Sequence, residues 1–173
     1  MNKKIYITGG LSSGKSFFAK KLSEKTGIEY FGMDQIVFKE SEFEERGEEE
    51  RNAIFENIVN MESWILEGTF TEDWVVPGLK MSSQIIYLDT PPLKRFYRFI
   101  KRTWPEGIFK QSDLFGRVTL VLGFRYKEWD RTVSGYRKLL EPFKDKLVTL
   151  ISNKEVEDFI SAHEEATYYT KKY

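Results

Sequence analysis

Short apolar runs alternate along the chain with longer segments in which apolar residues recur at helical spacing. The apolar runs are typical of buried strands and lie at 4–8, 28–33, 64–66, 84–88 and 147–151. The helical segments lie at 15–26, 42–61, 93–102, 117–141 and 154–167. Residues 71–81 fit neither pattern, because Pro77 and Gly78 interrupt any helix that begins there. This alternation predicts an α/β fold in which helices flank a doubly wound sheet of five parallel strands.

The size and composition of the chain favour one domain spanning residues 1–173. Of the 173 residues, 40% are hydrophobic and 16% are aromatic, which is enough for one core but not for two. Cysteine is absent, and the N-terminus leads into the first strand instead of an apolar signal region. No stretch approaches the roughly 18 apolar residues that a membrane span needs. We therefore expect a cytoplasmic protein without a membrane segment.

The most specific motif is GGLSSGKS at residues 9–16, which follows the first predicted strand and matches the phosphate-binding loop GxxxxGK[ST]. In such a loop Gly9 and Gly14 let the backbone approach the phosphates of a nucleoside triphosphate. Lys15 reaches the β and γ oxygens, and the Ser16 hydroxyl binds Mg²⁺. An ordinary glycine turn is the alternative, but the flanking strand and helix favour a nucleotide site. The predicted nucleotide-binding residues are Gly9, Gly10, Leu11, Ser12, Ser13, Gly14, Lys15, Ser16 and Phe17.

Three carboxylates follow predicted strands, at the edge of the sheet where open α/β folds bind ligands. Glu67 ends one strand, and we expect it to bind Mg²⁺ together with Ser16; a capping or solvent-facing carboxylate is the alternative. Asp34 ends another strand, and we expect it to accept the proton of an acceptor hydroxyl or to orient that hydroxyl. The alternative for this residue is the N-cap of the next helix. Asp89 is interpreted as a turn or capping residue.

The net charge is zero, but charge is unevenly distributed along the chain. Residues 40–73 hold twelve acidic and two basic residues, whereas residues 94–138 hold twelve basic and four acidic residues. A basic segment suits a triphosphate, because Arg and Lys stabilise the charge that develops on a transferred phosphoryl group. Solvated helix faces are the alternative explanation of the acidic segment. The zero net charge argues against general affinity for nucleic acid.

The order of these motifs resembles that of the adenylate kinase-like P-loop kinases. The phosphate loop, WILEGTF, IIYLDTP and an arginine-rich helix follow one another as in that family. Within it, the chain is most similar to small kinases described as DNA topology modulation proteins. Met33-Asp34 stands for their Leu-Asp pair and Glu67-Gly68-Thr69 for their Asp-Gly-Asn. The resemblance spans nearly the whole chain and implies a three-layer P-loop NTPase fold with an acceptor-side helical arm at 34–62 and a short lid at 103–131.

By this resemblance, arginines around the lid neutralise the transferred phosphoryl group. Arg98 and Arg102 match the two arginines of the helix that enters the lid, one near the adenine and one on the phosphates. Arg125 or Arg131, beyond the lid, is similar to the arginines that return over the transferred group. A surface ion pair is the alternative for each of them. The predicted catalytic residues are therefore Lys15, Asp34, Arg98, Arg102 and Arg131.

The chain departs from adenylate kinase in the segment that would hold a nucleoside monophosphate. After the third-strand carboxylate that family has Gly-Phe-Pro-Arg, whereas this chain has Gly68-Thr69-Phe70-Thr71. The arginine for a monophosphate is missing, and the segment 40–73 around this position is acidic. We therefore expect a neutral or cationic hydroxyl compound as the acceptor, although Arg46 and Arg51 remain available for a phosphate.

Together these features predict an ATP-dependent phosphotransferase that uses Mg²⁺ and acts on a small-molecule acceptor, as a monomer or a homodimer. A nucleotide-binding regulator that acts through a protein or DNA partner is an alternative, supported only by the basic segment 94–138. A GTPase is a third interpretation, but the guanine motif Asn-Lys-x-Asp is absent; the nearest string, at 152–155, ends in Glu155 one position too early. The sequence leaves the choice between ATP and GTP and the identity of the acceptor open.

Overall fold

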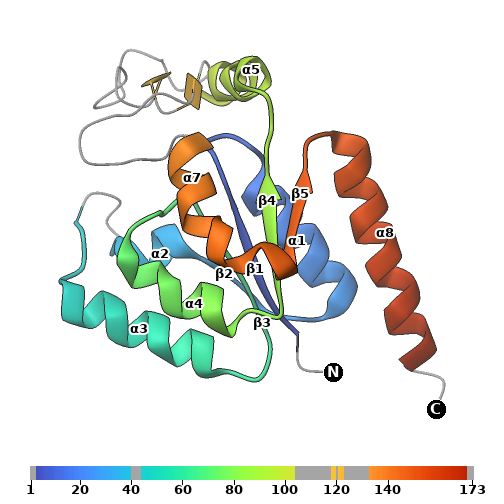
Figure 1. Ribbon diagram of the computed structural model, residues 1–173, viewed down its shortest axis with the longest axis horizontal. Coiled ribbons are helices and arrows are strands. Elements are labelled where there is room, and N and C mark those ends of the chain that lie inside the picture. Colours follow the sequence, from blue (N-terminus) through green and yellow to red (C-terminus); the bar gives the residue numbers. More distant parts are fainter. Residues whose placement is uncertain (1–2, 40–43, 104–117, 120, 123–132, 171–173) are drawn as a thin grey trace.

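A computed structural model describes residues 3–39, 44–103, 118–119, 121–122 and 133–170, and it has a parallel sheet with helices on both faces (Figure 1). The strands are β1 (Lys4–Gly9), β2 (Tyr30–Gly32), β3 (Trp64–Gly68), β4 (Gln84–Leu88) and β5 (Leu147–Leu150). Their order in the sheet is β2-β3-β1-β4-β5, and neighbouring strands are parallel. The predicted five-stranded α/β fold is confirmed. Most of the predicted lid at 103–131 lies outside the described residues.

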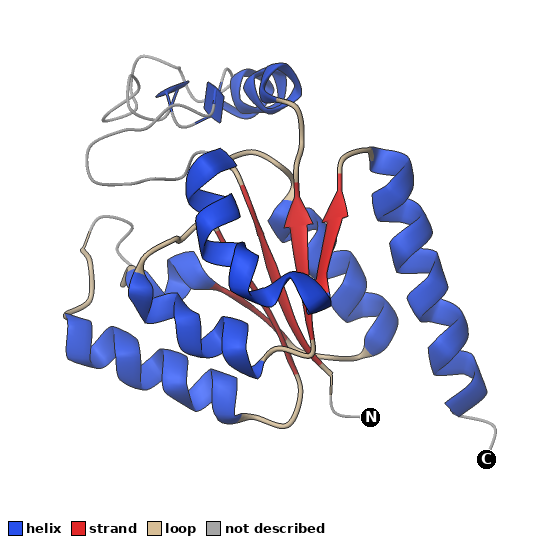
Figure 2. Ribbon diagram, viewed as in Figure 1, coloured by secondary structure: helices blue, strands red, loops and turns tan. Residues whose placement is uncertain are grey.

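The helices form two layers around this sheet (Figure 2). On one face, α1 (Lys15–Thr26) packs beside α8 (Asn153–Thr170). The other face is covered by α2 (Met33–Val37), α3 (Glu48–Asn60), α4 (Val76–Met81) and α7 (Val133–Leu140), with the 3₁₀ segments η1 (Asp73–Val75) and η3 (Glu141–Lys146). Beyond the carboxyl end of β4 lies α5 (Pro92–Thr103) (Figure 1). Within the described ranges, no helix is both long and apolar enough to cross a membrane.

The strands divide the core between the two faces, because successive side chains of a strand point to opposite sides of the sheet. In β1, Ile5 and Ile7 pack against α1 and α8, whereas Tyr6 joins the cluster on the opposite face. Trp64 and Leu66 of β3 lie in the same cluster as Tyr6. Full burial of a large apolar side chain stabilises the fold by about 1.5–3 kcal/mol. This packing holds the strands in place and thereby fixes where the loops at their carboxyl ends lie.

The acceptor side of the sheet differs from the prediction at the start of α2. The strand expected over 28–33 is only β2, and Met33 already belongs to α2. Met33 is fully buried, with its sulfur 3.4 Å from the Tyr6 hydroxyl. A Cβ on Gly68 would lie 2.5 Å from that sulfur, so β3 and α2 approach closely at this point. The predicted strand end is therefore wrong, and Asp34 follows in the first turn of a helix.

The helix expected over 42–61 is shorter than its sequence pattern. It begins at Glu48, because the preceding Gly47 has an extended backbone with φ −58° and ψ 153°. Before it, Glu45 pairs with Phe38 in an antiparallel bridge. Three glutamates in the first turn of α3 favour the helix start, since negative charge there interacts well with the helix dipole.

Residues 71–81, for which the sequence pattern is ambiguous, form η1 and α4. Pro77 lies in the first turn of α4, where its missing N–H costs no helical hydrogen bond. Gly78 permits close packing, because a Cβ there would lie 2.8 Å from the Phe55 ring. The dipeptide expected to interrupt a helix thus helps to begin one. Of the helix expected over 117–141, the described part is mainly α7.

Tyr136 connects α7 to the phosphate loop from within the core. Its buried hydroxyl lies 2.9 Å from the Gly9 carbonyl oxygen and 2.9 Å from the Thr69 carbonyl oxygen. Tyr136→Phe is expected to lower the free energy of unfolding by about 1–3 kcal/mol, because the one hydroxyl proton that these two carbonyl oxygens share is lost. Urea denaturation measures this loss, and Tyr97→Phe, at an exposed position of α5, is the control. An unchanged midpoint for Tyr136→Phe would show that the hydroxyl adds nothing to stability.

Candidate active site

The phosphate loop lies at the carboxyl edge of the sheet, between β1 and α1. Three residues at the loop have positive φ: Gly9 (147°), Ser12 (60°) and Gly14 (103°). A Cβ on Gly9 would lie 2.6 Å from the Leu88 carbonyl oxygen, so only glycine fits there. Turns with positive φ angles allow successive backbone N–H groups to surround an anion. The loop therefore has the local backbone that its sequence motif requires.

Polar groups of the loop lack partners where a phosphate would bind. The hydroxyls of Ser12 and Ser13 are buried and make no hydrogen bond within the described part of the chain. Lys15 is 7% exposed, and its Nζ donates a hydrogen bond to the Gly10 carbonyl oxygen at 3.2 Å. Buried polar groups normally have partners, so unpaired hydroxyls beside a buried lysine fit an anionic ligand. The residues present are thus suited to a triphosphate.

Ser16, on the first turn of α1, meets Glu67 at the end of β3. The Ser16 hydroxyl donates a hydrogen bond to Glu67 Oε1 at 2.9 Å, and Glu67 is 9% exposed. Burial raises the pKa of the Glu67 carboxyl, while the charge of Lys15 and the hydrogen bond from Ser16 lower it less. A hydroxyl and a carboxylate are oxygen ligands that Mg²⁺ accepts beside water and phosphate. The two predicted metal ligands lie together, and Glu67 is not a solvent-facing carboxylate.

Because the pKa of Glu67 is raised, binding of ATP with Mg²⁺ is expected to weaken as the pH falls. The weakening is expected to begin at a pH above 4.5, the ordinary pKa of glutamate. An ionised carboxyl attracts a divalent cation, and a protonated carboxyl does not. ATP titrations with Mg²⁺, from neutral pH down to pH 4.5, measure this change. Glu67→Gln cannot titrate and is the control, and titrations without Mg²⁺ account for protonation of ATP. A wild-type pH profile parallel to that of Glu67→Gln would contradict the metal-ligand assignment.

Asp34 lies in the first turn of α2 with an exposed side chain. The N-cap residue of α2 is Gly32, and no side chain caps the helix, so the alternative that Asp34 is the N-cap is wrong. The charge of Asp34 raises the pKa of Glu67, which places the two carboxylates in one electrostatic environment. Within the described residues, the Asp34 side chain makes no hydrogen bond or ion pair. Its oxygens are therefore available to a hydroxyl group.

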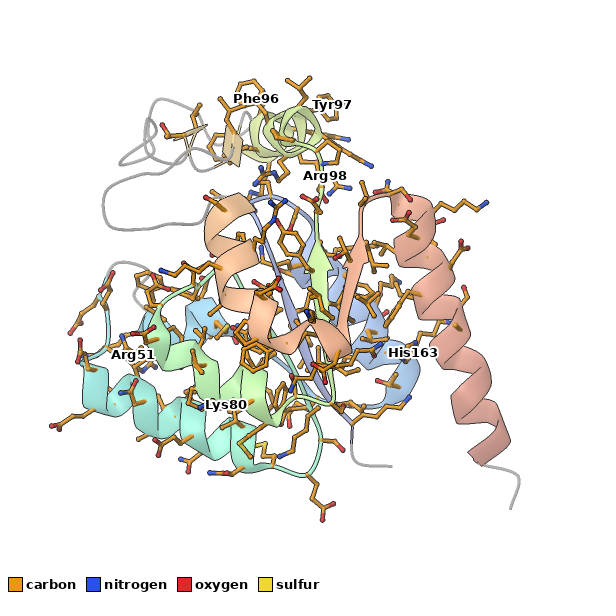
Figure 3. All side chains as sticks on the ribbon, in the orientation of Figure 1. Arg51, Lys80, Phe96, Tyr97, Arg98 and His163 are labelled. Carbon is orange, nitrogen blue, oxygen red and sulfur yellow. The ribbon has the colours of Figure 1, made fainter. Side chains whose placement is uncertain are left out.

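Arg98 connects α5 to the phosphate loop, and Figure 3 shows it beneath α5, toward the carboxyl end of β4. Its Nη1 donates a hydrogen bond to the Ser13 carbonyl oxygen at 2.6 Å, and its Nη2 donates one to Asn153 Oδ1 at 2.9 Å. A Cβ on Gly14 would lie 3.2 Å from Nη1, so the guanidinium also covers this glycine. Arg98 contacts the loop backbone and not a surface carboxylate.

Two predicted side chains, those of Arg102 and Phe17, make no hydrogen bond to the loop among the described residues, and a third predicted residue lies outside those residues. Arg102 is exposed near the end of α5, and its side chain has no hydrogen bond or ion pair with a described residue. Phe17 is exposed on the first turn of α1. Arg131, like Arg125, lies outside the described residues. The roles of these side chains stay predictions.

Sequence reasoning missed residues that reach the loop from distant parts of the chain. Thr90 Oγ1 donates a hydrogen bond to the Ser13 carbonyl oxygen at 3.0 Å, and Asn153 accepts one from Arg98. Arg95 is buried and lies against the loop. The sequence contains a signal for Arg95, because residues three apart share a helix face and Arg95 precedes Arg98 by three. No comparable local signal marks Thr90 or Asn153.

Comparisons with known proteins agree with this geometry at the level of the fold. No protein-family model and no curated protein matches the chain. The shikimate kinase from Acinetobacter baumannii in complex with shikimate has a TM-score of 0.60 at 18% identity, over 98% of this chain and 94% of that chain. The gluconokinase from Sinorhizobium meliloti 1021 has a TM-score of 0.57 at 14% identity, over 98% and 97%. The fold is that of small P-loop kinases.

A third solved structure, the shikimate kinase from Bacteroides thetaiotaomicron, has a TM-score of 0.53 at 14% identity, over 96% of this chain and 98% of that chain. These matches extend over nearly the full length of both chains. At such low identity the likeness concerns the arrangement of helices and strands and carries no substrate with it.

Proposed function

We propose that the protein is an ATP-dependent phosphotransferase that moves the γ-phosphoryl group of ATP to a hydroxyl group of a small molecule. The observation that carries this proposal is the 2.9 Å contact between Ser16 and Glu67 beside the buried Lys15. This arrangement supplies two oxygen ligands for a metal and a cation for the phosphates. Mg²⁺, when bound there, neutralises charge on the β and γ oxygens. The kinase fold supports the same function.

The proposed transfer uses side chains at the carboxyl edge of the sheet. Lys15 and Arg98 hold the phosphates. Asp34 accepts the proton of the acceptor hydroxyl while the oxygen of that hydroxyl attacks the γ phosphorus. The bond from the γ phosphorus to the bridging oxygen breaks, and ADP leaves with the electron pair. The products are ADP and a phosphomonoester, and Asp34 returns its proton to water.

We assign the remaining predicted residues and segments to closure around the substrates. Arg102 and Arg131 are proposed to add positive charge when the segment 103–131 closes as a lid, which excludes water and suppresses hydrolysis of ATP. The segment 34–62 is proposed to form the acceptor side, because Asp34 begins it and α3 follows on the same face of the sheet.

The contacts of two arginines favour an acceptor without a phosphate group. Arg46 donates hydrogen bonds to two backbone carbonyl oxygens, and its Nε pairs with Glu50 at 3.0 Å. Arg51 lies over the Trp74 ring, with its guanidinium carbon 4.8 Å from the ring centroid. Binding a phosphate would cost either arginine these contacts. The acceptor is therefore proposed to be a small, neutral or cationic hydroxyl compound.

ATP turnover with Mg²⁺ against a panel of acceptors tests the proposal. The panel contains neutral sugars and polyols, amino alcohols, hydroxy acids such as shikimate and gluconate, and nucleoside monophosphates. We expect a member of the first two classes to stimulate ADP release, with a phosphorylated product of matching mass. Rapid phosphorylation of AMP or CMP would contradict the proposed acceptor. Tight ATP binding without stimulation by any class would contradict the phosphotransferase.

Within the P-loop kinases, we infer a relation to the DNA topology modulation proteins. The support is the order of the phosphate loop, Met33-Asp34, Glu67-Gly68-Thr69 and the arginines of α5. We infer that the substrate is nonetheless a small molecule, because a chain of zero net charge lacks the general positive charge that DNA binding requires. Absence of cysteine suits a cytoplasmic site of action.

A further inference from the structure

Arg95 is a buried cation of α5 that the proposed transfer does not use. It lies three residues before Arg98 and is 5% exposed. Its guanidinium packs directly on the backbone of Gly10, where a Cβ would lie 2.8 Å from Cζ. A side chain at position 10 would therefore require the guanidinium to shift. The side chain is therefore aimed at the phosphate loop.

The guanidinium of Arg95 has no direct partner among the described residues. Its Nε is buried without a hydrogen bond, and no carboxylate of the described residues forms an ion pair with it. Burial lowers its pKa, and Tyr87, Tyr136 and Asp89 act on it electrostatically in the opposite direction. Arginine nevertheless stays protonated at neutral pH. A buried charge of this kind is costly until an anion compensates it.

The anion that fits this position is a phosphoryl group held by the same loop. Lys15 donates from Nζ to the Gly10 carbonyl oxygen at 3.2 Å, so Gly10 has one cation on its carbonyl group and Arg95 over its α-carbon. The lysine of a phosphate loop reaches the β and γ oxygens. We propose that Arg95 binds the γ-phosphoryl group of ATP as a second cation beside Lys15. This inference rests on the proposed function, because it takes the loop to bind a triphosphate.

The chemistry of the side chain supports this role. A guanidinium presents two parallel N–H groups that match the spacing of phosphate oxygens. To bind a phosphate, Arg98 would have to exchange its hydrogen bonds to Ser13 and Asn153, whereas Arg95 has no hydrogen bond to a described side chain to give up. Arg95 is already packed against the loop, so nucleotide binding has little side-chain freedom left to remove.

The test measures binding of ATP, ADP and tripolyphosphate with Mg²⁺ to the wild-type protein and to Arg95→Met by isothermal titration calorimetry. Methionine retains an unbranched apolar stem and removes the charge. We expect the Kd of ATP and of tripolyphosphate to rise about 10- to 100-fold, because a hydrogen-bonded charge is lost. The Kd of ADP is expected to change little, since ADP lacks the γ-phosphoryl group.

The melting temperature without nucleotide separates ligand binding from a structural role. Arg95→Met removes a buried charge that forms no ion pair with a described residue, so the variant is expected to melt at or above the wild-type temperature. A purely structural arginine would give the opposite result, a lower melting temperature with unchanged affinity for ATP, and would overturn the inference.

Two further variants control the charge and its position. Arg95→Lys keeps the charge without the planar guanidinium and is expected to recover part of the lost ATP affinity. Lys101→Met removes an exposed lysine from the same helix and is expected to leave all affinities unchanged. Wild-type ATP affinity in folded Arg95→Met would overturn this inference and leave the proposed function standing. Failure of the wild-type protein to bind ATP and tripolyphosphate would overturn the proposed function itself.

Discussion

Lys15→Ala is expected to abolish tight ATP binding and to reduce acceptor-dependent turnover by at least about 10²–10³-fold, the usual cost of losing a preorganised group that stabilises transition-state charge. The ammonium group is buried at the loop and already touches the Gly10 carbonyl oxygen. Alanine removes both the cation and its preorganised position, so the β and γ oxygens lose their nearest positive charge. Calorimetric titration of ATP and a coupled assay of ADP release measure the two effects.

Lys20→Ala is the matched control for this change. Lys20 is an exposed lysine of α1, so its removal alters the net charge by the same amount and leaves the loop unchanged. We expect its ATP affinity and turnover to equal those of the wild-type protein. Full ATP affinity in Lys15→Ala would contradict the assignment of the loop as a nucleotide site.

Asp34→Asn is expected to lower acceptor-dependent turnover by about 10²–10⁴-fold, the range for loss of a general base. The amide has nearly the shape of the carboxylate but does not accept the hydroxyl proton. Asp34 lies on α2, outside the phosphate loop, so its substitution is expected to change the affinity for ATP far less than the turnover. Steady-state kinetics with the best acceptor and ATP titration together separate these two expectations.

Glu29→Gln controls for the loss of one negative charge near the same strand. Glu29 is exposed and directly precedes β2, and we expect its substitution to change neither turnover nor ATP affinity. If Asp34→Asn kept wild-type turnover, Asp34 would have no part in the transfer. If it instead lost ATP affinity, the residue would belong to the nucleotide site and not to the acceptor side.

The phosphate loop and the end of α1 could be predicted from the sequence because their structure depends on neighbouring residues. Gly9, Gly14 and Gly27 have the positive φ angles that only glycine adopts readily, and each lies where the motif or the helix end requires it. The pairing of Ser16 with Glu67 also follows from the fold. Parallel β1 and β3 are neighbours in register, so the residues at their carboxyl ends meet at one edge.

The start of α2 could not be predicted because contacts from elsewhere in the chain determine it. The sequence pattern before Asp34 fits a strand as well as the start of a helix. The contacts that place Met33 in α2 come from Tyr6 of β1 and Gly68 of β3. These partners are distant in sequence, so no local pattern marks the change from strand to helix.

Arg95 and Tyr136 were missed for a related reason. The sequence shows a row of arginines in α5, but the burial of one of them depends on where that helix crosses the phosphate loop. The Tyr136 hydroxyl reaches Gly9 across 127 positions of the chain. The phosphate loop itself is contiguous in the sequence, whereas the residues that pack around it reach it through long-range contacts.

The proposed function requires that the γ-phosphoryl group of ATP goes to a hydroxyl group of a small molecule. Phosphorus-31 NMR of the wild-type protein with Mg²⁺, ATP and the best acceptor follows this transfer. We expect the γ resonance of ATP to disappear while ADP and a phosphomonoester form in equal amounts. Formation of ADP and inorganic phosphate alone, or an unchanged spectrum of bound ATP, would contradict it.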